Sequence, residues 1–231
     1  MQSETIVISG DFHGFVVKSD KPNAPGLLLI QEIFGVNANM RQVAHDYAAL
    51  GYTVLVPDLF WRTAPGIDLD PAVPADRERA MELNKAFDDA TGIADLREAA
   101  QLLRTQLTPG QKVGAVGYCL GGRLAFRLAA EKTVDAAVSY YGVNIHGFLQ
   151  EAKKPSPLLI HVAGADYLCP PDAQEAIRRA FADVPSVEVR HYDGAGHGFA
   201  RAHSQHYSAS AATSAGEATS KFLMRNLNEE G

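Results

Sequence analysis

One stretch of the chain limits the possible fold more than any other. It is residues 113–123, Val-Gly-Ala-Val-Gly-Tyr-Cys-Leu-Gly-Gly-Arg. An apolar run that meets closely spaced glycines predicts a buried strand, a very tight turn and a helix that begins at once. Gly117 and Gly121 flank Cys119 in the pattern Gly-x-Cys-x-Gly, the cysteine version of the Gly-x-Ser-x-Gly nucleophile elbow. Cys119 is therefore expected to project above the sheet, although a buried structural cysteine in a glycine-rich turn is the plain alternative.

Two further polar groups follow predicted strands downstream of this turn. The apolar residues 158–163 predict a strand, and Asp166 comes three residues after its end. Residues 187–192 alternate as a strand does, and the glycine-rich loop after them carries His197. In open parallel sheets, sites are built at the carboxyl ends of the strands. The three groups are thus expected to meet at one edge of the sheet, in the chain order nucleophile, acid, histidine.

The residue types suit nucleophilic catalysis. Cys119 at a helix N-terminus is favoured as a thiolate, and His197 is the candidate base that takes its proton. Asp166 would accept a hydrogen bond from the other ring nitrogen and fix the histidine tautomer. Asp193 competes for the acid role, but the strand–Gly–x–Asp context favours Asp166. Asp166 and His197 each have a purely structural alternative. The alternative for Asp166 is an aspartate that stabilises a turn, and that for His197 is a hydrogen-bonded loop histidine.

Three motifs together resemble the signatures of the dienelactone hydrolase family: Gln-Glu-Ile-Phe-Gly at 31–35, Gly-Tyr-Cys-Leu-Gly-Gly at 117–122 and Gly-His-Gly-Phe-Ala-Arg at 196–201. The resemblance runs from about Leu27 to the last predicted helix. It implies an α/β-hydrolase fold, with a mostly parallel central sheet covered by helices on both faces. The length of the chain and its lack of repeats or a linker predict a single domain over residues 1–231.

The resemblance assigns further site residues. It places the backbone N–H groups of Ile33 and Leu120 in an oxyanion hole and Glu32 beside the nucleophile as a fourth catalytic group. Candidates for substrate binding are Arg77, Arg201, Phe34 and Tyr118. The two arginines match positions where the family binds a substrate carboxylate, which a planar guanidinium can hold with two bonds.

One departure from the family pattern concerns the helix that carries Arg77. Related enzymes present aromatic side chains to the pocket there, where this chain has Met81 and Asn84. The reaction type is not affected by this difference, but the substrate is.

The implied activity is hydrolysis of a small ester or lactone, with a carboxylate on the substrate, through a thioester on Cys119. No cofactor is required. Alternatives are a carboxylesterase or thioesterase of other specificity, a thiol redox sensor on a hydrolase scaffold, and a binding protein that has lost catalysis. A redox sensor would need no acid–base partners, and a binding protein would be expected to lack one of the three groups.

The composition limits the kinds of molecule that the protein is expected to bind. The 231 residues carry a formal net charge of −6 and no cluster of lysines or arginines, which argues against nucleic acid and anionic membranes. No apolar run approaches the ~20 residues that a membrane span needs, and the N-terminus is not signal-like, so a cytoplasmic monomer is expected. The two cysteines lack CxxC spacing and the histidines form no tight ligand pattern, so no metal and no disulfide are predicted.

Apolar periodicity and glycine or proline stops predict the remaining elements. We expect an antiparallel edge hairpin from 5–8 and 12–17, and strands at 27–30, 52–56 and 134–141. Helices are expected at 39–50, 76–87, 89–107, 122–131, 170–182 and 208–227. Residues 59–75, which include Trp61, are expected to form a long surface loop near the site. His161 and Cys169 are expected to be core residues.

Overall fold

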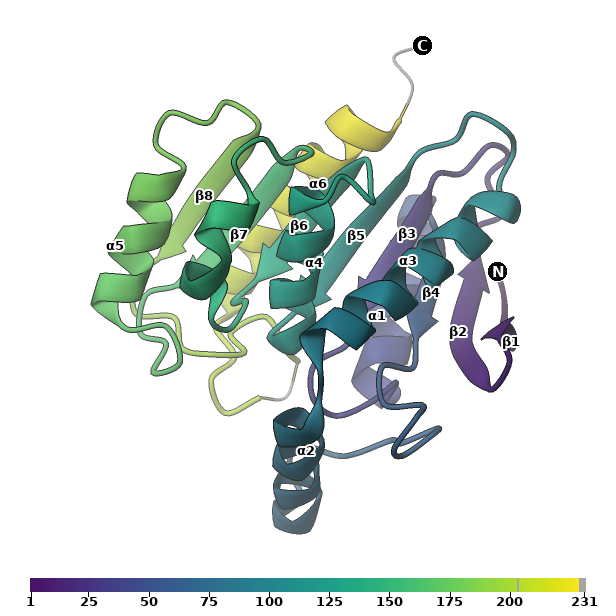
Figure 1. Ribbon diagram of the computed structural model, residues 1–231, viewed down its shortest axis with the longest axis horizontal. Helices are drawn as coiled ribbons and strands as arrows, with labels where there is room; N and C mark the ends of the chain where they lie inside the picture. The colour runs from purple at the N-terminus through teal and green to yellow at the C-terminus, as the bar shows by residue number, and fades with distance from the viewer. Residues whose placement is uncertain (203, 229–231) are drawn as a thin grey trace. The chain divides into compact units, whose positions relative to one another are not determined.

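The computed structural model describes residues 1–202 and 204–228 (Figure 1). The chain divides into two compact units, Met1–Gly114 and Ala115–Gly231. We call these the N-terminal unit and the C-terminal unit and describe each by itself. The single domain expected from the sequence stays a prediction.

The N-terminal unit contains the strands β1 (Gln2–Ser9), β2 (Phe12–Lys18), β3 (Gly26–Ile30) and β4 (Thr53–Pro57). They lie in the order β1-β2-β4-β3. β1 pairs antiparallel with β2, and β2 with β4, whereas β3 and β4 are parallel. The expected edge hairpin is confirmed. Leu27, Leu28, Leu29 and Ile30 are all fully buried, which explains why β3 is a continuous apolar run and not an alternating one.

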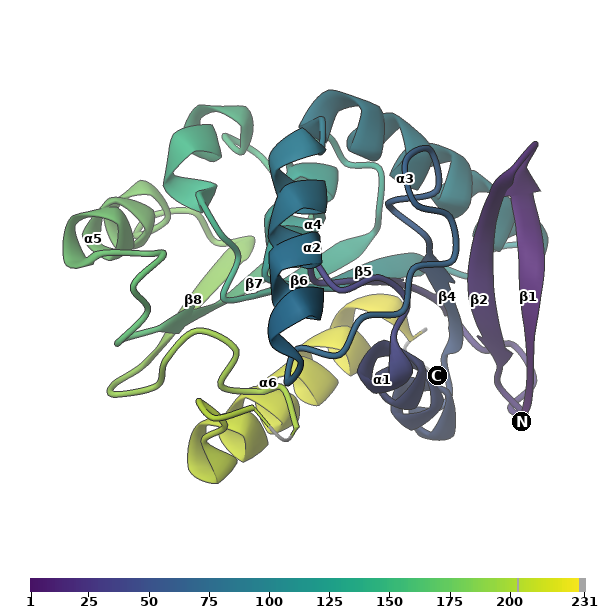
Figure 2. The same ribbon diagram turned by 90° about the horizontal axis from the view of Figure 1, so that it is seen from below.

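Three helices belong to this unit: α1 (Ala38–Leu50), α2 (Pro74–Ala86) and α3 (Asp89–Thr105). α1 begins where the Asn37 side chain accepts a bond from the Met40 N–H, and it ends at Gly51 with φ 108°. α1 packs on β4 and β2 and α3 on β3 and β4, and Figure 2 shows the two helices on opposite faces of the sheet.

The segment from residue 59 to α2 is a loop, but its first residues are not at the surface as the sequence led us to expect. Leu59 and Phe60 are buried. Trp61 stacks on Phe12 with a 5.5 Å centroid separation and donates from Nε1 to Asp95. The loop turns inward there because a stacked indole with a bonded N–H gains apolar contact without leaving a polar atom unpaired.

The C-terminal unit carries strands in the order β5 (Val113–Tyr118), β6 (Ala136–Tyr140), β7 (Leu158–Ala163) and β8 (Val187–Tyr192), where β5 begins at the last two residues of the N-terminal unit. β6 and β7 are parallel, as are β7 and β8. The helices are α4 (Leu120–Ala130), α5 (Pro171–Ala180) and α6 (Ala209–Leu227), with a 3-10 helix, η1 (Ile145–Glu151). α4 and α6 both pack on β6, from opposite faces (Figure 2).

These elements agree with the sequence-based expectations to within a few residues, except that η1 was not foreseen. In the described part of the chain, no helix has both the length and the apolar character required to span a bilayer. The parallel register of β6, β7 and β8 has one functional consequence. It brings the loops after β7 and β8, which carry Asp166 and His197, to the same edge of the sheet.

Candidate active site

The turn between β5 and α4 holds Cys119 in a strained backbone conformation, with φ 55° and ψ −114°. Non-glycine residues seldom adopt a positive φ, and the cost is of order 1–3 kcal/mol. The turn is tight because a Cβ on Gly117 would lie 1.9 Å from the Gly121 carbonyl oxygen. The Cys119 N–H donates to the Tyr140 carbonyl at 3.0 Å, so the β6 end holds the turn in place. This is the geometry that the Gly-x-Cys-x-Gly pattern predicts.

Asp166, His197 and Cys119 form one hydrogen-bonded series. His197 Nδ1 donates to Asp166 Oδ2 over 2.8 Å, and the same ring is hydrogen-bonded to the Cys119 side chain. The side chains are only 1% exposed for Asp166 and 11% for His197. The other carboxylate oxygen, Asp166 Oδ1, accepts the Leu168 N–H at 2.8 Å. The three residues that the sequence analysis singled out therefore lie together.

The surroundings of His197 favour its charged form. Burial lowers the pKa of the ring, but hydrogen bonds to Asp166 and Cys119 and the charges on those groups outweigh it and raise the pKa to about 10. The imidazolium is therefore the stable form of the His197 ring. A charged ring in this position carries a proton that it can donate.

Asp193, the competing acid candidate, is placed elsewhere. Its side chain is 98% exposed, and His191 Nδ1 lies 2.9 Å from its Oδ1. In the C-terminal unit, the carboxylate that reaches His197 belongs to Asp166.

Aromatic rings surround the site, and the sequence analysis missed two of them. Tyr141, buried and with φ 38°, meets the His197 ring edge-on at 5.1 Å. Tyr167 lies 6.2 Å from the same ring and is 76% exposed. Tyr118 stacks on Tyr140 at 4.7 Å. In the sequence, only position points to the two missed residues. Tyr141 directly follows β6, and Tyr167 directly follows Asp166.

His161 and Cys169 are core residues, as expected. The His161 ring is bonded at both nitrogens, to the Tyr192 hydroxyl at 2.8 Å and to Thr219 Oγ1 at 2.9 Å. Burial, together with the charge of Arg190, lowers the pKa of His161 to about 3, so the ring is neutral. Burial and then the nearby carboxylates raise the pKa of Cys169 to about 11, which keeps it a thiol.

The candidates from the 31–35 motif lie in the N-terminal unit, in the turn after β3. Glu32 and Phe34 are buried, and Ile33 is half-buried. The turn is fixed to the loop before α2: the Leu69 N–H donates to the Phe34 carbonyl at 3.0 Å. Gly35 has φ 79°, and a Cβ there would lie 2.0 Å from the Ile67 carbonyl oxygen, so only glycine fits.

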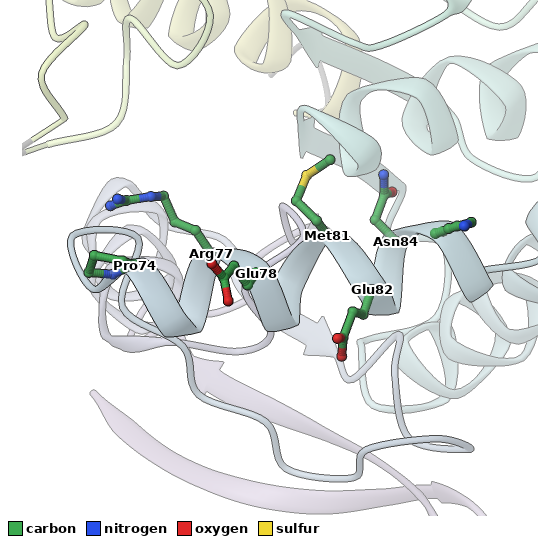
Figure 3. Close-up of a pocket in the computed structure, with 7 residues that line it drawn as sticks. Pro74, Arg77, Glu78, Met81, Glu82 and Asn84 are labelled. Carbon is green, nitrogen blue, oxygen red and sulfur yellow. The ribbon is translucent and has the colours of Figure 1, made fainter.

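Arg77 lies on α2 with Met81 and Asn84. The spacing i, i+4, i+7 puts the three on one face of the helix, and Figure 3 shows their side chains extending to the same side. They contribute to a concavity of about 910 Å³. Arg77 Nη1 donates to the backbone carbonyls of Pro71 at 2.8 Å and Ala72 at 3.1 Å. Its guanidinium therefore also holds the loop that precedes its own helix.

Arg201 lies in the C-terminal unit, four residues beyond His197. A Cβ on Gly198 would lie 3.4 Å from Arg201 Nη2, which places the guanidinium against the loop that carries His197. Nη2 also lies 3.5 Å from Ser204 Oγ. Arg201 is thus close enough to the His197 loop either to bind a substrate group or to support the loop.

Among residues 1–202 and 204–228, no group of three or more His, Cys, Asp or Glu side chains is placed to hold a metal ion.

The sequence of the chain is similar to those of one known protein family. A model of the dienelactone hydrolase family matches residues 12–227. The carboxymethylenebutenolidase of Pseudomonas putida is 43% identical over 213 residues, which cover 92% of this chain and 90% of that protein. The carboxymethylenebutenolidase of Pseudomonas sp. strain P51 is 36% identical over 217 residues, or 94% of this chain and 91% of the relative.

Solved structures show the same fold. A Klebsiella pneumoniae protein, provisionally described as a dienelactone hydrolase, has a TM-score of 0.83 at 22% identity, covering 97% of this chain and 98% of its own. The dienelactone hydrolase of Anabaena variabilis has a TM-score of 0.69 at 22% identity, covering 98% and 99%.

Mostly parallel strands, covering helices and this structural likeness define an α/β-hydrolase fold. The chain belongs to the dienelactone hydrolase family. It is accordingly a carboxylic ester hydrolase that acts on small molecules.

The raised pKa of His197 predicts a pH-dependent contribution to stability. An unfolded histidine has a pKa of about 6.5, so between pH 6.5 and about 10 folding takes up a proton at His197. This stabilisation is complete below pH 6.5 and is lost as the pH rises through 10.

Urea unfolding of wild type and His197→Gln from pH 6 to 10 should show the difference in their free energies of unfolding shrinking as the pH rises. A difference that stays constant would contradict the assignment, and His146→Gln, at an exposed position, is the control.

Proposed function

We propose that the protein hydrolyses a small ester or lactone through a Cys119–His197–Asp166 triad and a thioester acyl-enzyme. The observation that carries the proposal is the hydrogen-bonded series from Asp166 through His197 to Cys119, with the cysteine in a strained turn before α4. Relatives named carboxymethylenebutenolidase support a lactone as the substrate.

In the first half-reaction, His197 holds the proton of Cys119 and the thiolate attacks the carbonyl carbon of the substrate. The C=O electron pair moves to the oxygen, giving a tetrahedral oxyanion. When the oxyanion collapses, the C–O bond to the leaving oxygen breaks, and that oxygen takes the proton from His197. In a lactone the leaving alcohol stays attached to the acyl group. The product of this step is a thioester on Cys119.

In the second half-reaction, water replaces the thiolate as nucleophile. Neutral His197 takes a proton from the water, the hydroxide adds to the thioester carbonyl, and the C–S bond breaks to return the thiolate. Asp166 accepts from His197 Nδ1 in both halves, which fixes the tautomer and stabilises the imidazolium when it forms.

The oxyanion needs donors that are fixed in advance. Leu120 is the first residue of α4, and an N–H in the first turn of a helix has no partner within that helix. We assign it to the oxyanion hole together with the Ile33 N–H, which the family resemblance pairs with it. Glu32 is assigned, from the same resemblance, to hold the Cys119 thiol before substrate arrives. Phe34 and Tyr118 are assigned to the apolar wall of the pocket.

The substrate is proposed to carry a carboxylate, bound by Arg201 and Arg77. The α2 face that presents Arg77 also presents Met81 and Asn84, where the family has aromatic side chains. We therefore expect the group that contacts α2 to be less planar or less apolar than in the relatives. The cytoplasmic location and the monomeric state stay predictions.

Replacement of the nucleophile is the first test. Cys119→Ala should abolish turnover of a small activated ester and leave the fold intact, because the turn depends on backbone contacts. The matched control is Cys169→Ala, which removes the other, buried thiol and should keep the activity. Steady-state rates and circular dichroism of both variants check this. More than a few per cent of wild-type activity in pure Cys119→Ala would overturn the assignment, and a redox sensor or binding protein would show no turnover in wild type.

The charge of the substrate is the second test. A charge-assisted hydrogen bond contributes about 1.5–3 kcal/mol, so Arg201→Ala should lower kcat/KM about 10- to 150-fold for an ester or lactone that bears a carboxylate. A neutral ester lacks that contact and should change little. Arg178→Ala, which removes a surface arginine paired with Glu175, is the control. Equal losses on both substrates would mean that Arg201 supports the His197 loop and does not bind the carboxylate.

A further inference from the structure

The position of Asp166 depends on residues 163–170, from the last residue of β7 to the residue before α5, which we call the acid loop. The Ala165 N–H donates to the Ala195 carbonyl at 2.9 Å, and the Cys169 N–H donates to the Asp166 carbonyl at 3.2 Å. Both of these bonds join backbone groups. A second set of bonds, from outside the loop, fixes its two ends relative to each other.

Gln174, on the first turns of α5, makes that second set. Its Nε2 lies 2.7 Å from the Cys169 carbonyl oxygen, 3.3 Å from that of Gly164 and 3.4 Å from that of Ala163. Two of these carbonyls precede Asp166 and one follows it. One side-chain amide therefore bridges the start and the end of the acid loop.

The three carbonyls also fix which way the amide points. Because all of them are acceptors, the NH₂ group must face them and the oxygen must face away. Gln174 Oε1 then meets His191 Nε2 at 2.7 Å, so His191 donates to it. His191 lies on β8, and a Cβ on Gly164 would lie 2.7 Å from its Cε1, so the ring rests directly on the loop backbone. Asp193 Oδ1 lies 2.9 Å from His191 Nδ1.

We propose that Gln174 is a positioning residue for the proposed catalytic acid, with His191 setting the orientation of its amide. The proposal rests on the proposed function, since it requires Asp166 to be the acid. Gln174 acts through the backbone: it fixes the span of the acid loop and thereby the distance from Asp166 Oδ2 to His197 Nδ1. Asp193 contributes at the surface by holding the His191 ring.

The variant that tests this is Gln174→Met, which keeps the length and the helical preference of the side chain and removes the amide. A misplacement of about 1 Å in a catalytic site can cost on the order of 100-fold, so kcat for a small activated ester should fall roughly 10- to 100-fold with KM little changed. Ser156→Ala is the control, because it removes another side-chain bond to a backbone carbonyl, Ser156 Oγ to Val134 at 2.7 Å, at a position outside the acid loop. It should lower the melting temperature without lowering kcat.

A double-mutant cycle with Asp166→Asn separates positioning from general support of the fold. If Gln174 acts through Asp166, Gln174→Met should lower kcat in the wild-type background and have no further effect on kcat in Asp166→Asn. Its effect on the melting temperature should be the same in both backgrounds. Gln174→Glu keeps the oxygen facing His191 and removes the N–H donors, so it should show the same loss of kcat. It replaces Gln174→Met in these experiments if the methionine variant does not fold.

Three outcomes would overturn the proposal. A normal kcat in folded Gln174→Met or Gln174→Glu, with Asp166→Asn strongly impaired, would overturn the positioning role alone. Equal losses of kcat in the wild-type and Asp166→Asn backgrounds would mean that Gln174 does not act through Asp166. A normal kcat in Asp166→Asn itself would overturn the assignment of the acid and this proposal with it.

Discussion

The close approach of the β5 end to the first turn of α4 is the constraint on which the site depends. Gly117 leaves no room for a Cβ beside the Gly121 carbonyl, so the chain turns within one residue and Cys119 takes up a positive φ. The β6 end holds this conformation through the bond from the Cys119 N–H to the Tyr140 carbonyl. A strained residue of this kind persists only when its surroundings determine it from several sides. The strain is compensated by packing, since the neighbouring residues of α4 and β6 are almost all fully buried.

Two buried histidines of the C-terminal unit differ in charge because their surroundings differ. His197 lies beside Asp166 and Cys119, which raise its pKa to about 10, whereas His161 is buried among hydroxyls and has its pKa lowered to about 3. The contrast follows from the partners, because a carboxylate favours the charged ring and burial alone disfavours it. Strict parallel pairing of β7 with β8 sets the loops of Asp166 and His197 next to each other, and Gln174 closes the first of these loops.

The sequence predicted the features that local chemistry controls. Apolar runs with glycine and proline stops gave the strands and helices to within a few residues, and strand-end placement gave Cys119, Asp166 and His197 in order. What it could not give depends on contacts between distant residues. Trp61 is drawn inward by Phe12 and Asp95, which no local pattern indicates. Gln174 resembles any polar residue of a surface helix until the fold brings the acid loop to it. The roles of Glu32, Ile33 and Arg77 came from family resemblance and stay proposals.

In the proposed mechanism, Cys119 carries the acyl group during turnover. Rapid acid quenching of the wild-type enzyme with para-nitrophenyl acetate, followed by peptide mass spectrometry, tests it most directly. We expect an acetyl group on the peptide that contains Cys119 within the first turnover, and we expect hydroxylamine to remove it, as for a thioester. Normal release of nitrophenol with no acetylated peptide, or with the acetyl group on another residue, would contradict the mechanism.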